Sequence, residues 1–216
     1  ISLVRSVSYF TKLTAAKALL NLTTDDNMSA IRASGAVRIF ATLSAIDHPP
    51  IQHICSKGFH LLTLSELRRE ELVQRRAVLQ SLFNMVKCSS SRTRIKVGTS
   101  VCNLLACANT NKAAIRAGAL SVIKIIATMD VEELRESTAR VILTLAQDDS
   151  LHKILLREPI VPILVLILQQ SHGFTFECAI FALGCLAQTA IFRLPLIEKG
   201  CVAALVSTVL SGKIST

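Results

Sequence analysis

Apolar residues recur three and four positions apart through most of the chain, which is the spacing of one face of an α-helix. Short polar segments and prolines, such as Pro49 and Pro50, separate these runs. The pattern predicts a short helix over 25–34, which begins with acidic residues as the helix dipole favours, and longer helices over 36–46 and 51–64. Because the pattern predicts helices alone, we expect an all-α fold.

The order of these elements repeats with a period of about 41 residues. A glycine between a short helix and a longer apolar one recurs at Gly35, Gly118 and Gly200, at intervals of 83 and 82 residues, or two periods each. Arg76 and Glu158 stand midway, where the period requires two further corners. Glycine suits such a corner because it adopts a left-handed backbone without a Cβ clash. Repeats of this length indicate units that bury their apolar faces by stacking on one another.

A second marker has the same period. In each unit an apolar segment ends the last helix, and one residue of that segment is polar or small. These residues follow one another at steps of 42, 40, 41 and 41 positions: Asn21, Thr63, Asn103, Thr144 and Cys185. Two independent markers with one period predict a single domain over 1–216, with approximate units 1–24 (partial), 25–66, 67–107, 108–147, 148–190 and 191–216 (partial). The segment 64–76 is interpreted as one charged helix without a visible corner.

The amino-acid composition indicates which side chains form the core and in which cellular compartment the protein lies. Hydrophobic residues make up 51% of the chain, aromatic residues only 4%, and there is no Trp, so aliphatic side chains must fill the space between helices. The chain has seven cysteines, an odd number, and no CxxC motif, which indicates reduced and mostly buried thiols. We therefore expect a cytoplasmic protein, or one of both the cytoplasm and the nucleus. No apolar run approaches the roughly 20 residues of a membrane span.

The two ends of the sequence lack the polar residues that cap a stack of repeats. The sequence also begins without Met, so we expect it to be part of a longer array. Apolar residues near both ends are expected to be exposed and to promote self-association: Leu3, Val4, Phe10, Ala204, Val206 and Val209.

The sequence contains no pattern that indicates catalysis or a cofactor. GxxxxGK[ST] and GxGxxG are both absent. Cys102 and Cys107, like Cys178 and Cys185, fall short of a four-ligand metal site. The acidic pair at 148–149 stands where a helix begins, as capping requires. We therefore predict a protein that is not an enzyme and that holds no metal and no cofactor.

The net charge of +9 lies in one part of the chain. The stretch 72–129 contains nine basic residues and no acidic one, whereas the other residues comprise 15 basic and 15 acidic side chains. Such a stretch is either a solvated basic face, a docking patch for an acidic or phosphorylated segment, or a surface for nucleic acid or anionic membranes. Arg92, Arg94 and Lys96 stand near a helix start, where positive charge opposes the dipole, and form the candidate basic patch.

Taken together, these features resemble the armadillo-repeat family over nearly the whole chain. The resemblance rests on the corners Ser34-Gly35-Ala36 and Ala117-Gly118-Ala119, on the apolar helix over 120–127 and on the ending Ala18-Leu19-Leu20-Asn21-Leu22. It implies a right-handed α-solenoid of about five three-helix repeats, similar to the beta-catenin and importin-alpha superhelices. The HEAT repeat, with two helices per unit and a similar period, is the alternative.

The resemblance also implies a function, because armadillo arrays hold an extended peptide in a groove lined by their third helices. The groove asparagine of the family matches Asn21 and Asn103, and the other units have Thr63, Thr144 and Cys185. One turn earlier, where the nuclear-import adaptors have Trp, this chain has Lys17, Phe59, Thr99, Arg140 and Phe181.

A groove with Lys17 and Arg140 is more similar to the basic groove of beta-catenin, which takes acidic, partly apolar peptides. We therefore predict a protein-binding scaffold whose partner is an acidic or phosphorylated segment lying past Thr99 and Asn103. Binding of nucleic acid or an anionic membrane surface through 72–129 is the alternative, although the sequence has no aromatic stacking motif for nucleic acid.

Overall fold

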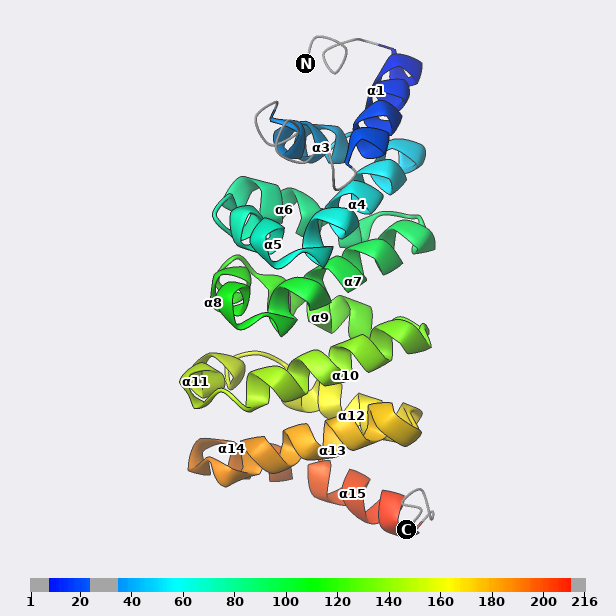
Figure 1. Ribbon diagram of the computed structural model, residues 1–216. Helices are drawn as coiled ribbons and strands as arrows, with labels where there is room; N and C mark the ends of the chain where they lie inside the picture. The colour runs from blue at the N-terminus through cyan, green and yellow to red at the C-terminus, as the bar shows by residue number, and fades with distance from the viewer. Residues whose placement is uncertain (1–7, 24–34, 211–216) are drawn as a thin grey trace. The chain divides into compact units, whose positions relative to one another are not determined.

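The computed structural model describes residues 8–23 and 35–210. Throughout these two ranges the secondary structure consists of helices and turns, without a β-strand, so the prediction of an all-α fold is confirmed (Figure 1). The chain divides into two compact units, Ile1–Val122 and Ile123–Thr216, and each is described below by itself. The predicted repeat boundaries remain predictions, and the short helix expected over 25–34 lies outside the described residues.

Unit 1 contains helices from successive repeats, joined by short connections. Their bounds are α1 (Tyr9–Leu22), α3 (Ala36–Ser44), α4 (Pro49–Leu64), α5 (Glu66–Val73), α6 (Arg76–Asn84), the 3₁₀ turn Met85–Lys87, α7 (Ser91–Ala106) and α8 (Ala108–Arg116). Helix α9 (Ala119–Ala127) begins in unit 1. Unit 2 continues with α10 (Glu132–Ala146), the 3₁₀ turn Asp149–Leu151, α11 (His152–Leu155), α12 (Ile160–Gln170), α13 (Gly173–Gln188), α14 (Ala190–Glu198) and α15 (Cys201–Leu210).

Equivalent helices of neighbouring repeats lie side by side within each unit. In unit 1 the third helices α1, α4 and α7 pack in that order, and the second helices α3 and α6 pack against each other (Figure 1). In unit 2 the third helix α10 packs against α13, and α12 packs against α15. This stacking buries the apolar faces that no repeat can cover alone.

Left-handed backbone at three of the predicted corners explains their glycines. Gly35, Gly118 and Gly200 have φ values of 76°, 101° and 80°, which side chains with a Cβ rarely adopt. The other two corners turn differently, because the described part of the chain contains no residue other than glycine with positive φ. Arg75, at the start of α6, has φ −111° and ψ 79°, and Pro159, at the start of α12, has φ −77° and ψ 41°.

The expectation of one charged helix over 64–76 without a corner is wrong at both ends, because the helix of this segment, α5, covers only Glu66–Val73. Ser65 is extended, with φ −95° and ψ 134°, and separates α4 from the shorter α5. The side chain of Arg69 replaces lost backbone contacts, because its Nη1 donates hydrogen bonds to the carbonyl oxygens of Thr63 at 2.9 Å and Leu64 at 3.3 Å. Those carbonyls stand at the end of α4, where helical partners are missing and a cation is favourable.

Apolar positions near the ends of the described ranges divide into exposed and buried residues. Phe10 is 78% exposed and Val206 is 52% exposed, as expected, whereas Ala204 is buried and its predicted exposure is wrong. Ala204 is covered because α15 packs against α12. Leu3, Val4 and the side chain of Val209 lie outside the part of the chain that the structure describes.

All seven cysteines are free thiols, and four are buried: Cys55, Cys102, Cys178 and Cys201. Burial raises the pKa of Cys55 to about 12. A thiol with so high a pKa forms little of the nucleophilic thiolate at neutral pH, so Cys55 serves as a small apolar side chain in the core.

A close approach of two helices in unit 1 yields a stability prediction. A Cβ on Gly58 of α4 would lie 2.7 Å from Cζ of Phe40, which is fully buried on α3. We expect Gly58→Ala to lower the free energy of unfolding by about 1–2 kcal/mol, because overpacking outweighs the better helix propensity of alanine. On α13, a Cβ on Gly184 would meet no atom within 4 Å. Gly184→Ala should therefore raise the free energy by about 1 kcal/mol. Urea denaturation measures both, and shifts of the same sign would contradict the packing described.

Candidate functional site

The exposed side of the third helix α7 has a regular row of polar residues. Arg92, Lys96, Thr99 and Asn103 follow one another at steps of four, three and four residues, which places them on one helical face. Arg92 is exposed and the other three are half-buried. The flanking residues of α7, among them Val97, Val101 and six others, are buried. This row therefore lies on the solvent-facing side of α7.

Asn103 is held in place by a residue of the neighbouring third helix. Its Nδ2 donates a hydrogen bond to Oγ1 of Thr63 at 3.2 Å, and that hydroxyl donates to the carbonyl oxygen of His60 at 2.8 Å. Thr63 itself is fully buried. Thr63 thus orients the Asn103 amide and has no exposed surface to offer a peptide.

The helix starts show which residues of α4 match Thr99 and Asn103. Helices α4 and α7 have 16 residues each and begin 42 positions apart, at Pro49 and Ser91. The ninth and thirteenth residues of α7 are Thr99 and Asn103, and those of α4 are Lys57 and Leu61. The sequence prediction put Phe59 and Thr63 at these places, two residues too far along.

The burial pattern agrees with this alignment. Phe59 is fully buried, and its ring centroid lies 6.3 Å from that of Phe40, so Phe59 belongs to the core of unit 1. Lys57 is exposed and Leu61 half-buried. Sequence reasoning missed Lys57, although the prolines that start α4 were a usable signal for the helix register.

Five basic side chains gather on the paired helices α4 and α7. This basic cluster comprises His53, Lys57, His60, Arg92 and Lys96. Burial, followed by the positive charges of Lys57, Arg92 and Lys96, lowers the pKa of His53. Burial and then the charge of Lys96 lower the pKa of His60. Residues of both helices thus contribute to one positive potential.

The third residue of the predicted basic patch lies apart from this cluster. Arg94 is two positions from Arg92, which corresponds to about 200° around a helix. Its side chain is half-buried, and its Nη2 donates to Oγ of Ser91 at 3.1 Å. The structure therefore brings Arg92 and Lys96 together with Lys57, and places Arg94 on another side of α7.

Helix α1 contributes the first two residues of the predicted groove. Lys17 and Asn21 are both exposed, four residues apart on one face of the helix. Because α1 packs against α4, a positive side chain precedes the basic cluster on the next third helix of unit 1.

The third helices of unit 2 present a different surface. On α10, Arg140 and Thr144 are exposed, and on α13, Phe181 is 65% exposed and Cys185 is half-buried. Phe174, one further α13 residue, is 55% exposed, and Cζ of Arg140 lies 5.7 Å from its ring centroid, within cation–π range. We call Arg140, Phe174 and Phe181 the aromatic patch. Arg140 is also paired with Glu136 at 3.7 Å, so this surface is apolar rather than strongly charged.

Two kinds of feature are absent from residues 8–23 and 35–210. These ranges contain no group of three or more His, Cys, Asp or Glu residues placed to hold a metal ion. Among their helices, none has the length and apolar character needed to cross a membrane.

Comparison with solved structures assigns the fold. A crystal structure of computationally designed armadillo repeat proteins for modular peptide recognition matches this chain with a TM-score of 0.78 and 16% sequence identity, over 95% of this chain and 89% of that one. The chain has the armadillo-repeat fold. A designed armadillo repeat protein in complex with the peptide (KR)4 matches with a TM-score of 0.74 at 16% identity, over 95% of this chain and 88% of that one.

A third similar structure, described as an engineered protein, matches with a TM-score of 0.73 and 18% identity, over 96% of this chain and 88% of that one. No protein-family model and no curated protein matches the sequence. Identities this low show the fold alone. The armadillo-type fold predicted from the repeat period and the glycine corners is thus confirmed.

Proposed function

We propose that this chain is a non-catalytic protein-binding scaffold that holds an extended, acidic peptide on the exposed face of its third helices, in the cytoplasm or nucleus. The observation that carries the proposal is the basic cluster. Helices α4 and α7 contain no acidic residue, and five of their basic or titratable side chains share one electrostatic environment. A surface of one charge sign raises the local concentration of ligands of the opposite sign and their association rate.

The residues beside the cluster suit an extended backbone. Asn103 and Thr99 lie on the same face as Arg92 and Lys96 and are half-exposed. An asparagine amide both donates and accepts hydrogen bonds, so it can pair with one peptide group of a strand-like ligand. In this proposal Asn103 binds the ligand backbone, while Lys57, Arg92 and Lys96 attract its carboxylates or phosphates.

The aromatic patch of unit 2 favours apolar ligand side chains. Phe174 and Phe181 expose large apolar surface, which folding alone would not favour, and Arg140 supplies a cation beside it. Thr144 and Cys185 lie one turn further along the two helices. We propose that α10 and α13 bind an apolar side chain, so that the complete ligand is acidic and partly apolar.

The acidic ligand proposed for this chain has the opposite charge to (KR)4, the peptide bound by one of the similar designed proteins. Binding of two labelled octapeptides, (KR)4 and an Asp- and Glu-rich peptide with one Phe, can be compared by fluorescence anisotropy. We expect the acidic peptide to bind at least tenfold more tightly, and raising the salt to weaken it, since charges in solution are screened beyond about 8 Å at physiological ionic strength. Equal binding of both peptides, or displacement only by nucleic acid or anionic vesicles, would contradict the proposal.

The histidines of the basic cluster predict how acid affects binding. The pKa values of His53 and His60 are below their ordinary value of 6.5 in the folded chain. Burial is the larger cause, and the smaller one is the positive charge of Lys57, Arg92 and Lys96 at His53 and of Lys96 at His60. An acidic ligand offsets this positive charge and so raises both pKa values, which means that binding takes up protons. The affinity for the acidic peptide should therefore rise severalfold as the pH falls from 7.5 to 5.5.

The stability of the free protein should change in the opposite direction. Since the unfolded chain binds more protons than the folded one just below pH 6.5, the free energy of unfolding should fall as the pH falls through this range. In His53→Gln/His60→Gln both pH dependences should be smaller. Titrations of peptide affinity and of urea midpoints test this, and an affinity that is flat or falls towards pH 5.5 would be inconsistent with the cluster as the binding site.

A further inference from the structure

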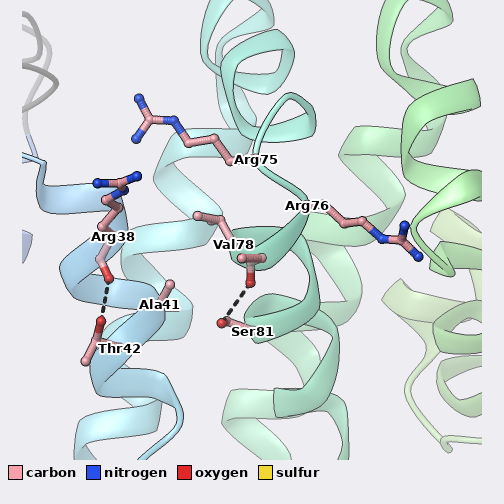
Figure 2. A pocket seen from close by; sticks show the side chains of 8 residues that line it. Arg38, Ala41, Thr42, Arg75, Arg76, Val78 and Ser81 are labelled. Atoms are coloured by element: carbon pink, nitrogen blue, oxygen red, sulfur yellow. Dashed lines mark hydrogen bonds between the residues drawn. The ribbon is translucent and has the colours of Figure 1, made fainter.

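A hollow with a volume of about 580 Å³ opens between the second helices of unit 1 (Figure 2). Helix α3 contributes Arg38 and Ala41, and α6 contributes Arg76 and Ser81, with Arg75 just before the helix. None of these residues belongs to α4 or α7, so the hollow is distinct from the third-helix face. Its size is in the range of small-molecule sites.

The charged residues that line the hollow are all positive, although Arg75 is paired with Glu71, which lies outside the lining. Three of the lining residues are arginines, and among the described residues no acidic side chain lines the hollow. Figure 2 shows the guanidinium groups of Arg38 and Arg75 on the same side of the hollow, whereas Arg76 points away from both. Nη2 of Arg75 donates to Oε1 of Glu71 at 3.1 Å, which orients the side chain and uses one of its nitrogens. Arg38 is exposed.

Helix α6 begins at the hollow without the residues that normally stabilise a helix start. Arg75 is the N-cap and makes no side-chain capping bond, and the first turn of α6 contains no acidic residue. The first amide groups of a helix lack intrahelical partners and form the positive end of its dipole. Arginines at this place add to an already positive potential, and the resulting repulsion destabilises the start of the helix. A bound anion would remove this repulsion.

We propose that the hollow binds a phosphate monoester, with Arg38 and Arg75 as its principal donors and the amides at the start of α6 as further donors. Guanidinium groups pair bidentately with phosphate oxygens, which favours phosphate over a single carboxylate. The group is carried either by a small organic phosphate or by a phosphorylated side chain of a protein. The site is independent of the proposed peptide-binding function.

The binding of three probes by the whole chain tests the proposal, by isothermal titration calorimetry at pH 7.5. The probes are phenyl phosphate, a short peptide with one phosphoserine, and the same peptide with unmodified serine. We expect at least one phosphate probe to bind and the serine peptide not to bind. Binding of phenyl phosphate, alone or together with the phosphopeptide, indicates that a small organic phosphate is sufficient as a ligand. Binding of the phosphopeptide alone indicates a phosphorylated protein.

Variants place the binding in the hollow. Arg38→Gln should lower the affinity for the phosphate probe at least fivefold while leaving the Arg75–Glu71 pair intact. Arg38→Gln/Arg75→Gln should lower this affinity at least tenfold. Arg157→Gln, an exposed arginine of unit 2, is the matched control and should change nothing. Lys57→Gln/Lys96→Gln, which weakens the basic cluster, should leave phosphate binding within twofold. The proposal is overturned if neither phosphate probe binds, if Arg38→Gln has no effect, or if the basic-cluster variant loses binding equally.

Discussion

Reversing three charges of the basic cluster is expected to slow the association of an acidic peptide roughly 10- to 100-fold at low ionic strength. The variant is Lys57→Glu/Arg92→Glu/Lys96→Glu, in which a positive surface on α4 and α7 becomes negative. Charges near an interface act mainly on the encounter of the partners, so the dissociation rate should change much less. Stopped-flow fluorescence with the labelled acidic octapeptide, at several salt concentrations, measures both rates.

The matched control reverses three exposed cations elsewhere in the chain, as Lys87→Glu/Arg116→Glu/Lys124→Glu. Both variants change the net charge by the same amount, so a purely global effect would slow both equally. We expect the control to slow association no more than about threefold, because none of its three residues belongs to α4 or α7 and salt screens exposed charges outside the binding face. Each surface substitution should shift stability by less than about 0.5 kcal/mol, so both variants should fold. Equal rates for the two variants would show that these three residues form no site.

Two phenylalanines that the sequence assigns to the same groove position should respond in opposite ways to truncation. Phe59→Ala is expected to lower the free energy of unfolding by about 3–5 kcal/mol, because the ring is fully buried beside Phe40. Phe181→Ala should change it by less than about 0.5 kcal/mol, because Phe181 is 65% exposed. Urea denaturation followed by circular dichroism measures both.

Peptide binding should distinguish the same two residues. Phe181→Ala should lower the affinity for an acidic peptide that contains one Phe about tenfold, and should leave the affinity for a peptide without Phe nearly unchanged. Phe59→Ala acts only through stability, so under conditions where it remains folded its affinity should equal that of the parent protein. A large stability loss for Phe181→Ala would mean that its ring is not on the surface.

Local backbone requirements made much of the fold predictable. The corners at Gly35, Gly118 and Gly200 were found because a left-handed φ excludes most other residues, so the requirement leaves a visible mark in the sequence. The corners near Arg76 and Glu158 have no such requirement and could be placed only by counting the period. The third helices were predictable from their apolar spacing, since their buried faces contact neighbours on several sides.

The details of the site were less predictable, because side chains of similar polarity have opposite environments. Thr63 looks like a groove residue, but its hydroxyl bonds the carbonyl of His60 inside its own helix, which allows it to be buried. That resemblance shifted the predicted register of α4 by two residues, which selected Phe59 in place of Lys57. The break at Ser65 was also missed, because the capping of Thr63 and Leu64 by Arg69 is a contact that no pattern of hydrophobicity reveals.

Photo-crosslinking of an acidic octapeptide, with one benzophenone residue, tests most directly that the third helices bind the ligand. After irradiation, mass spectrometry of the digested complex identifies the residues attached to the peptide. We predict crosslinks within α4 and α7, centred on Lys57, Lys96 and Asn103, and their loss on competition with unlabelled acidic peptide. Crosslinks confined to the second helices α3 and α6, or spread evenly over the chain, would contradict the account.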